Sequence, residues 1–304
     1  MAFRPLQATR GAVTLLLLGV NVIFWATPIV LLGFARLVLP WTPWQDLVGR
    51  WNIAMGQHWI SCNRGIFGLT HSLAFDVRGA AALRREEWYL MIANHRSWVD
   101  ILVLQLVFNR RVPFLKFFIK EQLKWVPFLG LAWWALDMPF MRRYSQAYLA
   151  RHPEMRGRDL EATRRACEKF RRIPTTIINF VEGTRLTPAK HAATAGAYRH
   201  LLPPKAGGLA YALSAMGGVL RTSLDVTIAY GEHTPSMWDL CCGRMGRLIV
   251  QVRERPVEPW MQTGDYGNDE AFRRRFQETL AGYWRDKDAL LDGLLAELRG
   301  TNAA

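Results

Sequence analysis

A long apolar segment lies near the start of the chain. Residues 11–35, GAVTLLLLGVNVIFWATPIVLLGFA, contain no charged side chain. At ~1.5 Å of rise per residue, a helix of this length can cross a hydrocarbon layer ~30 Å thick. The pattern therefore predicts a transmembrane or deeply inserted segment.

A re-entrant hairpin and a cleaved signal peptide are the two alternatives for this segment. Pro28 could bend it into a re-entrant hairpin resting in one leaflet, with the tryptophan-rich stretch 37–60 lying along the interface. A cleaved signal peptide fits poorly, because the apolar part is too long and no Ala-x-Ala-like site ends it. Arg4 and Arg10 precede the segment and Arg36 is the first charge after it, which gives a slight preference for a cytoplasmic amino terminus.

Past about residue 75, short apolar runs alternate with longer amphipathic ones, which is typical of an α/β domain. We expect strands at 88–93, 175–181, 225–230 and 247–253. Phe272, Phe276, Leu280 and Trp284 are spaced four apart with charges between them, which predicts an amphipathic helix packed on the domain. We divide the chain into a membrane anchor and interfacial segment, 1–60, and an α/β domain, 61–304.

A second apolar run covers residues 125–140, WVPFLGLAWWALDMPF. It is too short to span a membrane comfortably, and it carries Asp137. We expect a buried or membrane-surface hairpin here.

Charge and composition narrow the class of partner. The 304 residues carry a formal net charge of +14, which favours nucleic acid, an anionic membrane face or phosphorylated substrates. The 13 tryptophans favour the membrane, because indole rings settle at membrane–water interfaces. The four cysteines show no metal-ligand or C-x-x-C spacing, so we interpret them as reduced, buried or incidental thiols.

The stretch IANHRSWVD follows the strand expected at 88–93 and leaves His95 in the turn at its carboxyl end, where open α/β sheets place their sites. Ser97 is a good N-cap for the next helix. Two interpretations of Asp100 stay open on spacing alone. It could complete a capping box with Ser97, or it could form a catalytic pair with His95.

A second turn, NFVEGTR, follows the strand expected at 175–181. It brings Glu182, Gly183, Thr184 and Arg185 to another strand end. Gly183 permits close backbone approach to a ligand, and the planar fork of Arg185 suits phosphate oxygens. Two strand-end turns, one with a His and an Asp and the other with an anion-binding residue, are unlikely to coincide by accident behind an apolar anchor in a basic protein.

These residues resemble the membrane glycerolipid acyltransferases that acylate lysophosphatidate and related lysophospholipids. The first motif of that family, N-H-x-x-x-x-D, is met by Asn94, His95 and Asp100. The third, F-x-E-G-T-R, is met by Phe180, Glu182, Gly183, Thr184 and Arg185. FVEG stands where F-P-E-G is commoner.

The other motifs of the family match less specifically. In the second, MPFMRR nominates Arg143, and KEQLKWVPFLG before it nominates Lys120. LLPPKAGG resembles the fourth motif through Pro203 and Pro204. The long insert that ends there is similar to the branch containing bacterial inner-membrane acyltransferases and lysocardiolipin-type enzymes.

The resemblance implies a mixed sheet flanked by helices and direct acyl transfer from a thioester to a glycerol hydroxyl. His95 would be the general base and Asp100 would orient it, so that no serine nucleophile is required. Arg185, with Arg143 and Lys120, would bind the phosphate of the acceptor. Glu182 would orient an arginine or contact a glycerol hydroxyl.

We expect no metal and no cofactor, with acyl-CoA or acyl carrier protein as co-substrate. The expected partners are membrane phospholipid and lysophospholipid, with no nucleic acid, at the cell inner membrane with the active domain facing the cytoplasm. Three alternatives stay open: an acceptor other than lysophosphatidate, a degenerate acyltransferase fold that only binds lipid, and a non-catalytic membrane-anchored binder of polyanions. The basic segment 164–172 is a solvated helix face or a collector of anionic lipid or coenzyme A phosphates.

Overall fold

The computed structural model describes residues 3–80, 82–141, 151, 167–194, 196–231 and 233–301. The helices are α1 (Phe3–Val38), α2 (Thr42–Thr70), α3 (Val99–Phe108), the 3-10 helix η1 (Glu121–Trp125), α4 (Leu129–Ala135), α7 (Pro188–Ala192), α8 (Ala206–Met216), α9 (Met237–Cys242), α10 (Trp260–Thr263) and α11 (Glu270–Thr301). The strands are β1 (Phe75–Arg78), β2 (Tyr89–Ala93), β3 (Leu115–Phe117), β4 (Ile119–Lys120), β5 (Phe140–Met141), β6 (Thr176–Asn179), β7 (Thr222–Tyr230) and β8 (Leu248–Pro256).

A mixed sheet forms the centre of the molecule, in the order β1-β8-β7-β2-β6-β3. Only β7 and β8 are antiparallel, and the other neighbours run parallel. The carboxyl ends of β2, β6 and β7 therefore meet at one edge. The predicted α/β class is confirmed, and the four strands expected from the sequence correspond to β2, β6, β7 and β8.

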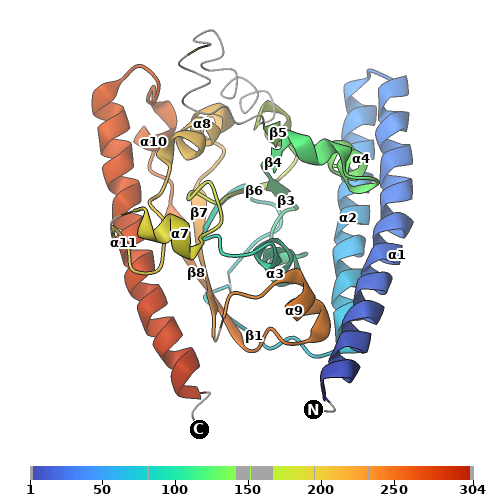
Figure 1. Cartoon of the computed structure of the whole chain (residues 1–304). Coiled ribbons are helices and arrows are strands. Elements are labelled where there is room, and N and C mark those ends of the chain that lie inside the picture. The colour runs from blue at the N-terminus through green and yellow to red at the C-terminus, as the bar shows by residue number, and fades with distance from the viewer. Residues whose placement is uncertain are drawn as a thin grey trace.

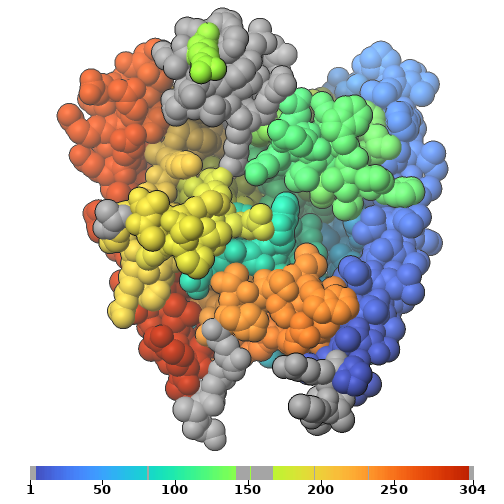
Figure 2. All heavy atoms as spheres, viewed as in Figure 1, coloured from blue at the N-terminus to red at the C-terminus, as the bar shows by residue number. Residues whose placement is uncertain are grey.

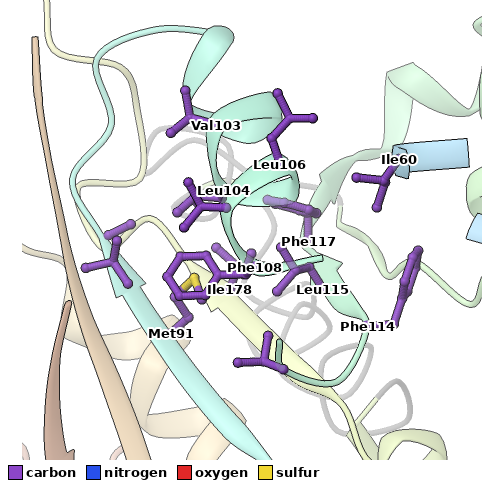
Figure 3. Packing of buried hydrophobic residues seen from close by; sticks show 14 of the residues in the cluster. Ile60, Met91, Val103, Leu104, Leu106, Phe108, Phe114, Leu115, Phe117 and Ile178 are labelled. Carbon is purple, nitrogen blue, oxygen red and sulfur yellow. The ribbon is translucent and has the colours of Figure 1, made fainter. Parts of the chain in front are cut away.

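Alternation along β2 divides the core between the two faces of the sheet. Met91 belongs to the cluster on one face, while Leu90 and Ile92 belong to the cluster on the other. On the first face, Figure 3 shows Leu104 and Phe108 of α3 packed close to Met91. Because α3 lies between this face and α2, it is apolar nearly all round.

The second face is covered by α8 and α11. Phe276, Leu280 and Trp284 of α11 are buried, as their spacing predicted, and the Trp284 indole donates to the carbonyl of Leu202 at 2.8 Å. In Figure 1, α11 runs along one side of the molecule while α1 and α2 run along the other.

The apolar amino-terminal segment forms a helical hairpin with its turn after Val38. Helix α1 continues through Pro28, so the chain does not turn back at that residue as the re-entrant alternative required, and α2 runs back beside α1. Asn21 of α1 donates to the side-chain oxygen of Asn63 of α2 at 2.8 Å. The predicted boundary at residue 60 falls within α2, and the domain division stays a prediction.

Helix α1 is long and apolar enough to cross a membrane, over Pro5–Val38. It carries exposed apolar side chains, among them Leu16 and Phe24. It also packs on α9 and on α4. The first and last thirds of α1 are thereby tied to different parts of the α/β domain.

The hairpin expected at 125–140 is not formed. The segment instead holds the end of η1, the short helix α4 and strand β5. Asp137, in the turn between α4 and β5, pairs with Arg36 of α1 at 2.5 Å. The four cysteines are free thiols, and Cys167, Cys241 and Cys242 are buried.

Candidate active site

The turn after β2 brings His95 and Asp100 together. The imidazole Nδ1 of His95 lies 2.8 Å from Oδ2 of Asp100. The His95 side chain is 14% exposed, and that of Asp100 is 1% exposed. One ring nitrogen is thus held by a buried carboxylate, which leaves Nε2 as the nitrogen that can accept a proton.

Asp100 contacts both the backbone of its own turn and the ring of His95. Oδ2 accepts from the backbone N–H groups of Arg96 at 2.6 Å and Ser97 at 2.9 Å, which is half of a capping box. The same oxygen contacts His95. The Ser97 hydroxyl accepts from the N–H of Val99, the first residue of α3, at 3.1 Å and donates to the carbonyl of Pro235 at 2.5 Å. The N-cap position of α3 is Trp98, one residue after the expected cap.

Tyr230 completes the surroundings of Asp100 and was missed in the sequence. Its hydroxyl donates to Oδ1 of Asp100 at 2.6 Å. Burial, together with the Asp100 charge, raises the pKa of Tyr230 well above its usual value, so it remains a hydrogen-bond donor. The available signal was its place as the last residue of the strand expected at 225–230.

Asn94 fixes the start of the turn. Its side-chain nitrogen donates to the carbonyl of Ile228 and its oxygen accepts from the N–H of Ile228, both at 2.9 Å. The β2–β7 ladder ends at the pair Ala93 and Val226. The Asn94 amide therefore extends the ladder by one pair after the backbone of β2 has turned toward His95.

Glu182 joins the second turn to the first. One carboxylate oxygen accepts from the N–H of His95 at 2.9 Å, and the other accepts from the N–H of Leu202 at 3.2 Å. Its side chain is buried, which raises the pKa of Glu182 to about 7 against the opposing effect of these two hydrogen bonds. The contacts described for Glu182 are thus to backbone groups.

A further backbone bond locks the two turns together. The N–H of Leu186 donates to the carbonyl of His95 at 2.8 Å. Gly183 has φ +68°, in the left-handed region that favours glycine. The rings of His95 and Phe180 stack with centroids 4.1 Å apart, so Phe180 packs against one face of the imidazole.

Arg185 is held beside this pair by an aromatic contact. Its guanidinium carbon lies 4.8 Å from the ring centroid of Trp98, and the side chain is exposed. Two lysines missed in the sequence lie nearby. Lys190 donates to the Thr184 hydroxyl at 2.5 Å, and the aliphatic chain of Lys205 lies against Gly183. Their only signal in the sequence was charge within the insert.

Of the two remaining predicted binding residues, the structure describes one. Lys120 is exposed at the end of β4. Arg143 lies outside the described residues. Within the described ranges, no three His, Cys, Asp or Glu side chains gather as metal ligands would.

The site faces the surface. In Figure 2 the teal atoms at the start of α3 lie at the centre of the molecule's front, between the yellow segment that holds α7 and the orange segment that holds α9. A buried acid, a part-exposed histidine and a cluster of basic side chains therefore share one accessible sheet edge. This arrangement suits proton transfer beside a bound anion.

Comparison with known proteins assigns the chain to a family. The family model described as Acyltransferase matches residues 74–231, just over half of the chain. The chain belongs to this acyltransferase family. The resemblance inferred from the motifs is confirmed at this level.

The relatives include enzymes of glycerolipid chemistry. The 1-acyl-sn-glycerol-3-phosphate acyltransferase gamma of Homo sapiens is 25% identical over 263 residues, covering 83% of this chain and 62% of that protein. An uncharacterised acyltransferase of Schizosaccharomyces pombe is 24% identical over 218 residues, covering 71% of this chain and 68% of that protein. Among solved structures, the 1-acyl-sn-glycerophosphate (LPA) acyltransferase PlsC of Thermotoga maritima aligns with a TM-score of 0.46 and 20% identity, over 90% of this chain and 95% of that one.

Proposed function

We propose that this protein transfers a fatty acyl group from a thioester donor, acyl-CoA or acyl carrier protein, to the free hydroxyl of lysophosphatidate, giving phosphatidate. The observation that carries the proposal is the 2.8 Å contact between His95 and Asp100, at an edge where Arg185 stands within the same pair of turns. The family membership and the acceptor named for the curated relatives support it.

The chemistry requires one base and one set of anion contacts. Nε2 of His95 takes the proton of the acceptor hydroxyl as its oxygen attacks the thioester carbon. The carbon–oxygen bond forms, the carbon–sulfur bond breaks, and the imidazolium returns the proton to the departing thiolate. Asp100 holds Nδ1–H and stabilises the imidazolium.

Ser97 is a poor candidate for a covalent intermediate. Its hydroxyl is buried and already engaged with Pro235 and Val99. Direct transfer to the substrate hydroxyl therefore accounts for the arrangement without an acyl-enzyme. Arg185, assisted by Lys190 and Lys205, would bind the phosphate of the acceptor.

The decisive test is acyl transfer by the purified full chain in detergent. The panel holds lysophosphatidate, other lysophospholipids and a neutral monoacylglycerol, each with acyl-CoA and with acyl carrier protein as donor. We expect transfer to lysophosphatidate, and loss of it in His95→Ala. Preference for another lysophospholipid would reassign the acceptor, and transfer to monoacylglycerol at the same rate would remove phosphate recognition.

The membrane anchor is part of the proposal. We infer that α1 inserts into the cell inner membrane and that the α/β domain faces the cytoplasm, where both donors are found. The length and apolar composition of α1 support insertion.

A further inference from the structure

A charged cavity of about 200 Å³ lies between the turn end of the α1–α2 hairpin, α4 and the segment at 169–175. None of the residues of the two catalytic turns lines it. Its charged lining residues are four cations and two carboxylates: Arg36, Lys116, Lys169, Arg172, Asp46 and Asp137. At ~30 Å³ per water, the space exceeds what one or two solvent molecules would fill.

Lys116 of β3 is the most buried of these cations. Its side chain is 3% exposed, and its ammonium donates to the carbonyl of Leu136 and lies 5.7 and 5.6 Å from the ring centroids of Phe114 and Phe170. Burial lowers the pKa of Lys116 to about 8. A buried ammonium normally has a counter-charge of its own, because leaving water is costly.

The nearby carboxylate is shared. Asp137 lies 2.5 Å from Arg36 and 3.7 Å from Lys169, and its charge also acts on Lys116. On the other wall Arg172 is paired with Asp46 at 2.8 Å. The cavity lining therefore keeps an excess of positive charge that an anion would neutralise.

The mouth of the cavity is apolar and exposed. Leu37 is 65% exposed and Trp134 38% exposed, and both line the cavity. Trp41, in the turn of the hairpin, is also 65% exposed. Arg36 is the first charge after the uncharged run of α1, so the cavity stands where the apolar surface of that helix ends.

We propose that this cavity binds the phosphate group of an anionic phospholipid, whose acyl chains extend past Leu37 and Trp134. The bound lipid is distinct from the acceptor, because the site does not contain His95 or Arg185. The site bridges the hairpin and the sheet, since Arg36 comes from α1 and Lys116 from β3. Lipid bound there would fasten the α/β domain to the membrane at a second point.

The experiment is a calorimetric titration of the full-length protein in neutral detergent. The titrants are short-chain phosphatidylglycerol and inorganic phosphate, which separate a lipid from a free anion. We expect saturable binding of the lipid and much weaker binding of phosphate. Equal affinity for both would keep an anion site but overturn its assignment to lipid, and binding of neither would overturn the site.

Variants assign the binding to the cavity. Lys116→Met should weaken lipid binding on the order of 10- to 100-fold, the value of one charge-assisted hydrogen bond. Lys124→Met, an exposed lysine paired with Glu121, is the matched control and should bind normally. Arg185→Ala should also bind normally. Loss of binding in Arg185→Ala with retention in Lys116→Met would move the lipid to the catalytic site and overturn the proposal.

Two further variants keep the test independent of folding. Lys169→Met alters a side chain that is 66% exposed, so it should fold, and it should weaken binding by less than Lys116→Met. Asp137→Asn removes the carboxylate that competes with the ligand, so it should tighten binding. Unchanged affinity in both would exclude the cavity even if Lys116→Met fails to fold.

Discussion

At the scale of single residues, one substitution separates the structural role of Asp100 from its proposed chemical role. In Asp100→Asn, the amide oxygen can accept from His95, Arg96 and Ser97, while the amide nitrogen can donate to the hydroxyl oxygen of Tyr230. The turn should therefore survive, with a stability loss of ~1 kcal/mol or less. The lost charge no longer stabilises the imidazolium, so kcat should fall on the order of 10²–10⁴-fold.

The measurement is kcat for acyl transfer to lysophosphatidate beside a thermal melt. Asp239→Asn is a matched control, because Asp239 completes a capping box with Ser236 at the start of α9. It should cost similar stability and leave kcat nearly intact. His95→Ala should be about as damaging as Asp100→Asn and the double variant scarcely worse. An Asp100→Asn protein that keeps more than about half its activity would exclude the catalytic pair.

Glu182 gives the stability of the protein a pH dependence. Burial raises its pKa from 4.5 to about 7, so between these values the folded chain holds a proton that the unfolded chain releases. The free energy of unfolding is therefore highest, as far as Glu182 is concerned, below about pH 4.5. It falls as the pH rises from about 4.5 to about 7, and Glu182 causes no further change above that. In Glu182→Gln, the free energy of unfolding should change less with pH over this range.

Urea unfolding of both proteins across that pH range measures the slope. The exposed Glu278→Gln is the control and should keep the wild-type slope. An identical slope in Glu182→Gln would show that Glu182 does not hold the proton.

Arg185→Ala tests anion recognition. Without the proposed bidentate contacts to phosphate, kcat/KM for lysophosphatidate should fall by ~10²-fold, if charge-assisted hydrogen bonds are worth roughly 1.5–3 kcal/mol each. Arg199→Ala, which removes an exposed arginine paired with Asp292, should change little. Unchanged kinetics in a well-folded Arg185→Ala protein would remove Arg185 from the site.

At the scale of elements, two glycines of α1 predict opposite effects of alanine. A Cβ on Gly33 would lie 2.6 Å from the Cβ of Ala135 in α4, whereas a Cβ on Gly19 would meet nothing within 4 Å. Gly33→Ala should therefore cost ~1–3 kcal/mol through overpacking. Gly19→Ala should gain ~0.5–1 kcal/mol of helix propensity.

Thermal melts of the two variants in the same detergent compare them directly. A rise in melting temperature for both would mean that α1 and α4 do not approach closely at Gly33. The comparison needs no activity, so it tests the hairpin packing independently of the site.

The sequence predicted those elements whose pattern is local. Strands β2, β6, β7 and β8 and the helix α11 follow from apolar runs and periodicity, and the turns after β2 and β6 follow from their motifs. Strands β1 and β3 have only four and three residues, and their pairing with distant strands decides them.

The site residues that the sequence did not predict also depend on contacts between segments distant in sequence. Tyr230 reaches Asp100 only because β7 lies beside β2, and Lys190 reaches Thr184 only because the insert folds back. The chain does not turn back at Pro28 because the loss of one hydrogen bond at a proline does not have to end a helix of this length. No spacing along the chain encodes these contacts.

At the scale of the whole molecule, the apolar surface of α1 should decide how the protein is retained. We expect it to sediment with membranes and to resist alkaline carbonate extraction, because apolar burial does not depend on salt. The net charge of +14 would give only salt-sensitive attachment. Complete release by high salt would show that charge, and not insertion, holds the protein there.

The sheet order also determines when the central sheet can be completed during synthesis. Edge strand β1 is hydrogen-bonded to β8, with Phe75 opposite Leu248, so its partner is synthesised long after β1 itself. At ~5–20 residues per second, the intervening chain takes about 10 to 30 s to leave the ribosome. Helix α1 has emerged long before that and is available to the membrane throughout. During this interval β1 is an unpaired strand on a nascent chain, and delayed arrival of β8 prolongs its exposure to aggregation and to proteases.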